Sequence, residues 1–353
     1  MADAIAVVSP VCPAPLLTVD RVQLGHGSGG KMSAALLREC FLPHLGNPVL
    51  ARLADGAVVA TGAGELAIST DTFVVSPLEF PGGDIGALAV HGTLNDVAMM
   101  GARPLCLTAG FVLEEGLPIE RLERIVRSMG ASARAAGVPV VTGDTKVVER
   151  GKADGLYINT TGIGLLDGDF RPGPERARSG DAVLVSGPLG RHGIAIMAVR
   201  EGIAFESPVE SDTACLVPLV EALRTAVGPE VRVLRDPTRG GLASALNEIA
   251  AASRVGIELD EGATPVPAEV AGACEMLGLD PLYVANEGVL VAIVPAGRAS
   301  SALEALRAHP LGAAAAVAGR VVAAHPGLVV LRTRLGGSRV VDLLPGDQLP
   351  RIC

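Results

Sequence analysis

The sequence has very few aromatic side chains: it contains no tryptophan, two tyrosines and six phenylalanines in 353 residues. Little is therefore available to stack on nucleic-acid bases. The formal net charge of −9 points the same way, because nucleic-acid-binding surfaces carry clustered lysine and arginine. We therefore expect no nucleic-acid partner.

Long apolar runs are also missing. Hydrophobic residues make up 49% of the chain, but glycine and proline interrupt them throughout, and no run reaches the ~18 residues of a membrane-spanning helix. The first residues show no basic stretch followed by an apolar one, so nothing indicates secretion. We expect a cytoplasmic, soluble protein that does not enter a membrane.

Cysteine pairs with metal-binding or redox spacing are absent too. The six cysteines are scattered, without a CxxC pair, at positions 12, 40, 106, 215, 274 and 353. No cluster of histidine and cysteine indicates zinc or an iron–sulfur site. In a cytoplasmic chain the first five are expected to be buried free thiols. Cys353 is different because it is the last residue.

The segment before that terminal thiol is not expected to be helical. Pro345, Gly346 and Pro350 interrupt it, and proline lacks the amide donor and fixes φ. We therefore expect residues 341–353 to form an extended or turned, mobile tail. Such a tail could carry Cys353 to the active site of another protein or back to the active site of its own chain. A frayed terminus that ends in cysteine by chance is the alternative.

Apolar periodicity and breaks rich in glycine and proline predict a two-domain α/β fold. The main break, rich in proline, glycine and charge, spans residues 171–180. The first half is expected to alternate strands and helices at 65–75, 84–100, 104–113, 118–136, 139–142 and 155–166. The second half repeats this alternation at 182–186, 193–201, 213–227, 241–253 and 289–294. The expected divisions are an extension at 1–18, a first domain at 19–168, a second at 169–340 and the tail at 341–353.

A glycine-rich loop is the first polar motif in the chain. Glycine lets backbone amides wrap around an anion, so such a loop is a candidate phosphate cradle. Its candidate members are Gly27, Ser28, Gly29, Gly30 and Lys31. The loop nearly matches a P-loop, but Met32 replaces the hydroxyl residue, and it nearly matches a dinucleotide-binding motif, but the acidic residue expected about 20 positions later is missing. A flexible glycine turn remains the alternative.

Carboxylates occur at positions that apolar elements disfavour. Asp71 lies in the middle of a predicted strand, and Asn95 and Asp96 lie on an otherwise apolar helix. Asp236 precedes a proline and two glycines at a helix entrance, where an N-cap and turn is the structural alternative. Three carboxylates with a glycine loop and a lysine are what Mg²⁺-nucleotide chemistry requires. His91, on the same helix, is expected to be a core residue.

A polar quartet, Gly143 to Lys146, directly follows the short buried strand predicted at 139–142. The carboxyl ends of strands in α/β proteins commonly bind ligands. We therefore expect Asp144, Thr145 and Lys146 to lie at a ligand site. Spacing alone does not show that this quartet and the three aspartates converge.

Seven segments are specific in combination. They are GHGSGGKM at 25–32, STDTFVVSPLEFPGGDIG at 69–86, HGTLNDVAMMGARP at 91–104, VTGDTKVVERG at 141–151, RDPTRGGLA at 235–243, NEG at 286–288 and the terminal PRIC. Together they resemble the HypE family of [NiFe]-hydrogenase maturation proteins, within the superfamily of aminoimidazole ribonucleotide synthetase and selenophosphate synthetase. The resemblance runs from about residue 22 to the end, and only the proline-rich start departs from it.

The resemblance implies an activity and partners. A HypF-type carbamoyltransferase would place a carbamoyl group on Cys353, and ATP would be used to dehydrate the thiocarboxamide to a thiocyanate. The cyanide would then pass to iron on a HypC–HypD complex. The implied fold is that of aminoimidazole ribonucleotide synthetase, with two α/β domains, the first of which pairs through its sheet in a homodimer.

The same resemblance implies a Mg-ATP site. The metal would be held by Asp71, Asp96 and Asp236, and the glycine loop would cover the phosphates. The remaining nucleotide-binding candidates are Asn95, Asp144 and Thr145, with Lys146 beside them.

The chemistry assigns provisional roles to two residues. Phosphorylation of the amide oxygen turns water loss into phosphate loss, and a base must take the nitrogen protons. Glu287 is the candidate base, and Lys146 is the candidate to stabilise charge that develops on oxygen or phosphate. Two alternatives remain: a small-molecule kinase or synthetase of the same superfamily, which leaves Cys353 unexplained, and a non-catalytic carrier, which leaves the carboxylates unexplained.

Overall fold

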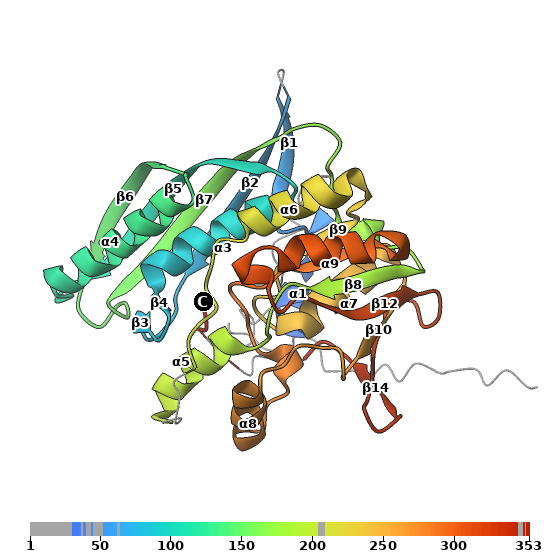
Figure 1. The fold of residues 1–353 in the computed structure, drawn as a ribbon. Helices are drawn as coiled ribbons and strands as arrows, with labels where there is room; N and C mark the ends of the chain where they lie inside the picture. Colours follow the sequence, from blue (N-terminus) through green and yellow to red (C-terminus); the bar gives the residue numbers. More distant parts are fainter. Residues whose placement is uncertain are drawn as a thin grey trace, which may run out of the picture.

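The computed structural model describes residues 30–36, 38–39, 44, 52–61, 64–203, 209–344, 349 and 351–353. They form two α/β units, each built on one large sheet (Figure 1). The α/β class expected from the sequence is confirmed. Gly27, Ser28 and Gly29 of the predicted phosphate loop lie outside the described residues, so their role stays a prediction.

The first sheet has the strand order β1-β2-β7-β5-β6. Neighbouring strands run antiparallel except β5 and β6, which run parallel. The strands are β1 (Ala57–Thr61), β2 (Gly64–Phe73), β5 (Arg103–Glu114), β6 (Val140–Val148) and β7 (Leu156–Leu166). Shorter elements of this half are α1 (Lys31–Leu36), β3 (Glu79–Phe80) and β4 (Gly83–Asp84).

The two faces of this sheet differ. Helices α3 (Ile85–Met99) and α4 (Ile119–Ala135) lie on one face (Figure 1). On β7 the even-numbered residues from 156 to 166 are buried, whereas the odd-numbered ones are half-buried or exposed on the side away from α3. We call this second side the outer face. It pairs Ile68 with Ile163 across β2 and β7.

Helix α3 is held tightly against the sheet. It begins at the N-cap Asp84, whose Oδ1 accepts the backbone N–H groups of Gly86 and Ala87. Small residues on β7 permit the close approach: a Cβ added at Gly164 would lie 2.4 Å from Val97 Cγ1. Because α3 also packs against the second unit, nearly every residue on it is buried.

The second sheet has seven strands in the order β14-β13-β10-β12-β8-β11-β9. They are β8 (Asp181–Val185), β9 (Val233–Arg235), β10 (Gly256–Asp260), β11 (Val291–Pro295), β12 (Ala316–Val322), β13 (Val329–Arg332) and β14 (Ser338–Val341). The helices are α5 (Arg191–Glu201), α6 (Val217–Val227), α7 (Gly241–Ser253), α8 (Ala268–Leu277) and α9 (Ala299–Arg307). One core packs α7 against the sheet, and a second packs α6 and α9 against its other face.

Two predicted elements were wrong in detail. The short buried strand expected at 139–142 is the exposed edge strand β6, and the quartet 143–146 lies within it. Parallel pairing with β5 is continuous from Thr142 to Val148, so the hydrogen-bond ladder runs through the polar residues. The helix expected from Thr213 begins at Val217, because residues 211–214 make contacts with both domains instead.

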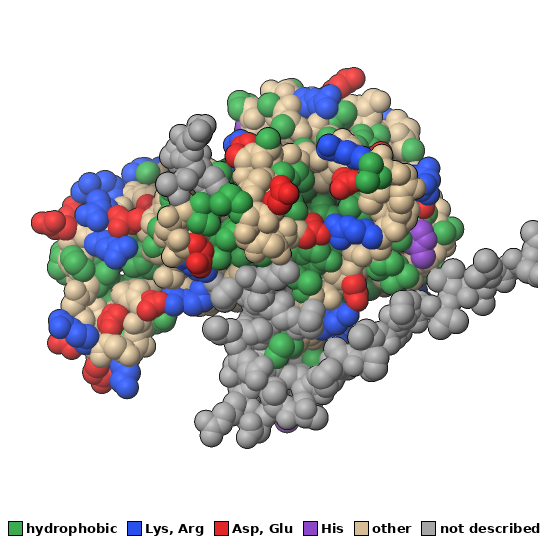
Figure 2. Space-filling view, turned by 90° about the horizontal axis from the view of Figure 1, so that it is seen from below, with side chains coloured by type: hydrophobic (Ala, Val, Ile, Leu, Met, Phe, Trp, Pro, Cys, Tyr) green, Lys and Arg blue, Asp and Glu red, His purple; other side chains and the backbone are tan. Residues whose placement is uncertain are grey.

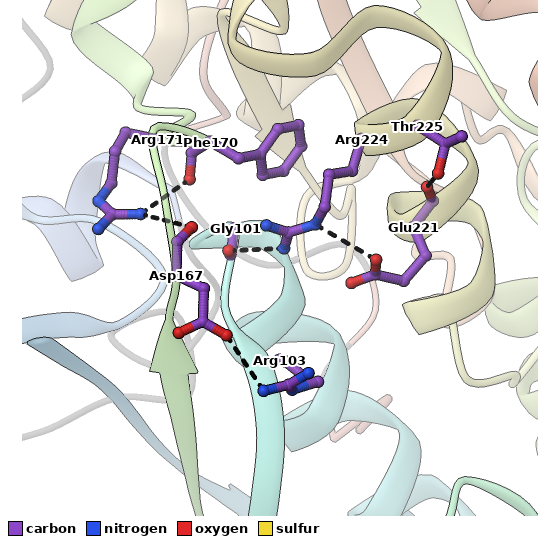
Figure 3. A network of polar contacts seen from close by, with 8 residues as sticks. All are labelled: Gly101, Arg103, Asp167, Phe170, Arg171, Glu221, Arg224 and Thr225. Atoms are coloured by element: carbon purple, nitrogen blue, oxygen red, sulfur yellow. Dashed lines mark hydrogen bonds and ion pairs between the residues drawn. The ribbon is translucent and has the colours of Figure 1, made fainter.

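The two units are joined by polar contacts as well as by α3. Arg224 on α6 donates to the carbonyl of Gly101 at 2.8 Å, and its guanidinium lies 4.4 Å from the ring centroid of Phe170. Glu221 lies 3.3 Å from Arg224 and orients it (Figure 3). A cation stacked on an aromatic ring and hydrogen-bonded across a boundary restricts motion between the two units.

Charged side chains of both signs are interspersed over the face of the molecule shown in Figure 2. In the part of the chain that the structure describes, no helix combines the length and apolar character needed to cross a membrane.

Gly164→Ala is expected to lower the free energy of unfolding by about 1–3 kcal/mol, because the added methyl group overpacks the contact between β7 and α3. Chemical denaturation followed by circular dichroism measures this change. Gly272→Ala is the control, since Gly272 lies in α8 with no atom within 4 Å of an added Cβ, and it should be neutral or stabilising by up to ~1 kcal/mol. Equal effects of the two substitutions would contradict tight packing at Gly164.

Candidate active site

Three carboxylates converge where the two units meet. One oxygen each of Asp55, Asp96 and Asp236 lies within 4.8 Å of the others. Asp55 precedes β1 and Asp96 lies on α3, whereas Asp236 follows β9 in the second unit. The Ser69 hydroxyl lies 2.7 Å from Asp96 Oδ2 and holds that carboxylate in place. We call these three aspartates the carboxylate cluster.

Sequence reasoning found two members of the cluster and missed the third. Asp96 and Asp236 were candidates, but Asp55 lies in a plain Ala-Asp-Gly-Ala stretch with no motif around it. The sequence offers one signal at Asp55: neither an apolar pattern nor a helix start explains a carboxylate at this position. The tertiary contact with Arg235, at 2.5 Å, is what brings Asp55 into the site.

The cluster concentrates negative charge in a place with little water. Burial raises the pKa of Asp236 to about 7, and the charge of Asp55 adds to the rise. Burial also raises the pKa of Asp96 well above its ordinary value, with Asp236 the next cause. Asp236 Oδ2 has no hydrogen-bond partner among the described residues. Crowded oxygen ligands with an unsatisfied buried atom fit Mg²⁺, which prefers hard oxygen donors.

Asp71 lies beside the cluster, and its predicted role as a metal ligand stays a prediction. It stands opposite Thr160 on the α3 face of the sheet. Burial raises its pKa, and the charge of Arg239 opposes the rise. Its own charge contributes to the raised pKa of Asp96. Asp71 therefore belongs to the same electrostatic neighbourhood.

Glu287, the predicted base, lies in a loop fixed by buried polar groups. Asn286 accepts from the backbone N–H of Gly190 at 2.6 Å and donates to the Pro237 carbonyl at 2.8 Å. The backbone N–H of Glu287 lies 3.3 Å from each oxygen of the Asp212 carboxylate. Burial raises the pKa of Glu287 well above its ordinary value. Its Oε1 has no hydrogen-bond partner in the described part of the chain.

The C-terminal residues are docked between the two units (Figure 1). The backbone N–H of Val74 donates to the Cys353 carbonyl at 3.1 Å, and that of Ser76 donates to the Arg351 carbonyl at 3.4 Å. Ile352 is buried in the apolar core that α3 and α4 share. Cys353 is 9% exposed, so its thiol is shielded in this position.

This docking brings the terminal residue to the side of the molecule where Arg239 and Glu287 lie. Val74 directly follows Phe73, and a Cβ added at Gly92 would lie 3.0 Å from the Phe73 ring and 3.9 Å from Glu287 Oε2. Negative charge at Cys353 is also the main cause of the raised pKa of Arg239. The end of the chain, the candidate base and an arginine therefore share one neighbourhood. Of the other described thiols, Cys274 is buried, whereas Cys106 and Cys215 are half-buried.

The side-chain amide of Asn95 joins the two units. Its Oδ1 accepts from the backbone N–H of Leu216 at 2.7 Å, and its Nδ2 donates to the Ala214 carbonyl at 3.0 Å. Both hydrogen-bonding groups of the amide are thus used to join α3 to the second unit. Asn95 fixes the helix turn that carries Asp96, and its predicted role at a nucleotide stays a prediction.

The quartet on β6 does not join the cluster within one chain. Asp144 and Lys146 are exposed and paired with each other at 2.6 Å. Asp144 stands opposite Gly110, which stands opposite Asn159, so it lies on the outer face. Thr145, the next residue on the strand, is likewise exposed. Their predicted roles at a nucleotide stay predictions.

The described end of the glycine loop contacts the start of the tail. Lys31 Nζ lies 2.7 Å from Asp342 Oδ2, and the backbone N–H of Lys31 donates to the Leu344 carbonyl at 3.0 Å. Gly30 is buried next to it. Lys31 therefore lies at the base of the tail in this structure.

Family models agree with the two units. Residues 53–166 match the N-terminal domain of AIR synthase related proteins, and residues 178–331 match the C-terminal domain of the same family. Carbamoyl dehydratase HypE from Azotobacter vinelandii is 56% identical over 332 residues, covering 94% of this chain and 97% of the relative. The chain belongs to the HypE family. The HypE of Escherichia coli is 48% identical over 341 residues, covering 95% of this chain and 100% of the relative.

Solved structures of the HypE family have the same fold. A HypE–HypF complex aligns with a TM-score of 0.84 and 46% identity, covering 88% of this chain and 100% of that one. A HypE in complex with ATP aligns with a TM-score of 0.80 and 52% identity, covering 94% and 100%. The two-domain fold expected from the resemblance is thereby confirmed.

Asp96→Asn is expected to stabilise the metal-free protein and to remove its response to Mg²⁺. A raised carboxylate pKa means that the folded state binds protons more tightly than the unfolded state. Stability therefore falls as pH rises above the ordinary aspartate pKa and through the raised values of Asp96 and Asp236, of which that of Asp236 is about 7. Removing one charge at pH 8 should raise the melting temperature by about 2–4 °C. Asparagine keeps the volume and can still accept from Ser69.

Differential scanning fluorimetry at pH 5 and pH 8, with and without MgCl₂, tests this prediction. Asp167→Asn is the matched control, because Asp167 is an exposed carboxylate that pairs with Arg103. Mg²⁺ should raise the melting temperature of the wild type and of the control. An undiminished Mg²⁺ shift in the Asp96 variant would exclude Asp96 from the metal site.

Proposed function

We propose that this protein is an ATP-dependent carbamoyl dehydratase that converts an S-carbamoyl group on Cys353 to a thiocyanate for [NiFe]-hydrogenase maturation. The observation that carries the proposal is the docking of the terminal cysteine between the two units, where its charge and those of Asp71, Asp96 and Glu287 all act on Arg239. The names of the curated relatives and the solved HypE structure with ATP support it. A small-molecule kinase of the same fold would leave this docked cysteine without a purpose.

The reaction balances as thiocarboxamide plus ATP giving thiocyanate, ADP, phosphate and one proton. The carbonyl oxygen attacks the γ-phosphorus, and the bond from that phosphorus to the bridging oxygen breaks, so ADP leaves. Two protons then leave the nitrogen while the carbon–oxygen bond breaks, and the C≡N bond forms as phosphate departs. Glu287 takes one proton, and the other leaves with phosphate. Because burial raises its pKa, Glu287 is a stronger base than an exposed glutamate.

The protein's own groups prepare the site for this chemistry. Mg²⁺ held by Asp55, Asp96 and Asp236 would neutralise charge on the transferring phosphate. Arg239 faces the charges of Cys353, Asp71 and Glu287 and can balance negative charge that develops there. The buried position of Ile352 keeps water away from the end of the chain, which favours loss of water from the amide.

A HypF-type carbamoyltransferase has to reach the thiol before dehydration. Cys353 is 9% exposed in the docked position, so we propose that the chain beyond β14, which ends at Val341, also adopts an outward position for carbamoylation. MgATP would favour the inward position, provided that it interacts differently with the two. The solved HypE–HypF complex supports such a partner. The cyanide would then pass to iron on a HypC–HypD complex.

We propose a homodimer formed through the outer face of the first sheet. That face carries partly exposed apolar side chains such as Ile68 and Ile163. Asp144, Thr145 and Lys146 lie on the edge strand β6 of the same sheet. Any contribution of these residues to nucleotide binding or charge stabilisation would come through the second subunit, because Asp144 and Lys146 face away from the cluster of their own chain.

Cys353→Ala is expected to abolish cyanide formation and to leave MgATP binding unchanged, because the thiol is the covalent carrier. Intact mass spectrometry after incubation with HypF-type enzyme, carbamoyl phosphate and ATP should show adducts of about 43 and then about 25 Da on the wild type only. Cys274→Ala, which removes a buried internal thiol, is the control. An adduct that persists in the Cys353 variant would refute the assignment of the carrier.

Light scattering at micromolar concentration should give about twice the chain mass of 35.8 kDa. Ile163→Asp should convert the dimer to a monomer, because a carboxylate would be buried at the outer face. Met276→Asp is the control, since Met276 is 72% exposed on α8 in the second unit. A wild-type monomer, or equal effects of the two variants, would count against this interface.

A further inference from the structure

His192 on α5 holds the end of the chain by a hydrogen bond whose direction the chemistry determines. Its Nε2 lies 2.7 Å from the Ile352 carbonyl, which can only accept, so Nε2 carries the proton. Its Nδ1 is then the acceptor for the Ser211 hydroxyl at 2.8 Å. The ring is completely buried and meets Phe80 edge-on at 5.5 Å between centroids. Burial lowers the pKa of His192 to about 4, which agrees with a neutral imidazole at neutral pH.

Arg200, about two turns beyond His192 on α5, contacts the same segment. Its guanidinium donates to the carbonyls of Ser76 and Arg351. Arg351 in turn donates to the Val74 carbonyl at 3.1 and 3.2 Å, and it pairs with Asp154. The last three residues are thus held between the first unit, through residues 74–76, and the second unit, through α5.

The segment that supports His192 also supports the candidate base. Ser211 accepts from the backbone N–H of Thr213 at 3.1 Å. Asp212, between them, accepts from the backbone N–H groups of Glu287 and Gly288, the latter at 3.1 Å. Burial raises the pKa of Asp212 to about 6. Residues 211–213 therefore connect the imidazole that holds the tail to the loop that carries Glu287.

We propose that His192 and Arg200 are positioning residues that clamp the backbone of residues 351–353, and that residues 211–213 align the clamped terminus with Glu287. Of this inference, only the role of the alignment in dehydration rests on the proposed function. The clamp itself consists of contacts to main-chain carbonyls, so it acts on the terminus whether or not the thiol carries a carbamoyl group. Neither residue contacts the carboxylate cluster in the described structure, so MgATP binding should not depend on them.

The test compares variants that remove or restore a donor at Nε2. His192→Phe keeps the ring and its packing but leaves the Ile352 carbonyl without its donor, whereas His192→Gln places an amide N–H near the same point. Arg200→Gln removes the guanidinium, and Arg191→Gln is the matched control, since Arg191 lies on the same helix and pairs with Glu269 at the surface.

The first measurement is the rate at which a thiol reagent labels Cys353 in the nucleotide-free protein, resolved by peptide mapping. Labelling follows the undocked fraction. His192→Phe and Arg200→Gln should speed it roughly tenfold, as expected for the loss of one buried hydrogen bond, while His192→Gln and Arg191→Gln stay near the wild type. Labelling of buried Cys274 should not change, which separates loss of the clamp from general unfolding.

The second measurement follows conversion of the carbamoyl adduct to the cyano adduct in a single turnover, with MgATP affinity measured by calorimetry. Conversion should slow in His192→Phe and recover in His192→Gln at unchanged affinity. Unchanged labelling of Cys353 in both His192→Phe and Arg200→Gln would overturn the clamp. Failure of the wild type to acquire a carbamoyl adduct would instead refute the proposed function and leave the labelling result to stand by itself.

Discussion

The structure depends on the concentration of negative charge at the boundary between its two units. Three carboxylates whose oxygens lie within 4.8 Å cannot all be ionised without a compensating cation. Arg235 compensates part of this charge through Asp55, and it is held on its other side by Glu248. Because Asp55 and Asp96 come from one unit and Asp236 from the other, a cation bound here would also draw the two units together.

The same boundary receives the end of the chain. Val74 and Ser76, which follow β2, donate backbone hydrogen bonds to the terminal residues, and Ile352 fills part of the apolar core. The free energy gained by burying these few side chains is comparable to the conformational entropy lost when the backbone is ordered. The hydrogen bonds from α5 therefore decide whether the terminus is docked. A terminus held mainly by main-chain contacts can leave and return without disturbing the rest of the fold.

Helix α3 transmits the arrangement of one unit to the other. Asn95 fixes its position against residues 214 and 216, and the next residue, Asp96, belongs to the carboxylate cluster. Gly162 and Gly164 allow the helix to lie directly on the sheet that carries Asp71. A small displacement of α3 would therefore move Asp96 relative to Asp236. The helix is packed on almost every side.

By itself the sequence determined the α/β class and most helices and strands, since hydrophobic periodicity, glycine and proline act locally. It also singled out Asp96 and Asp236, because polar groups at apolar positions need a reason to be there, and both lie in the carboxylate cluster. Motifs that cluster in the sequence did not all cluster in space: Asp144 and Lys146 lie on the outer face, since strand register, which depends on long-range pairing, decides the face. Only the tertiary structure shows that Asp55 lies in the cluster, that Asn95 joins the two units and that His192 binds the terminus. These contacts join residues up to 181 positions apart, from Asp55 to Asp236. No local pattern encodes contacts of that kind.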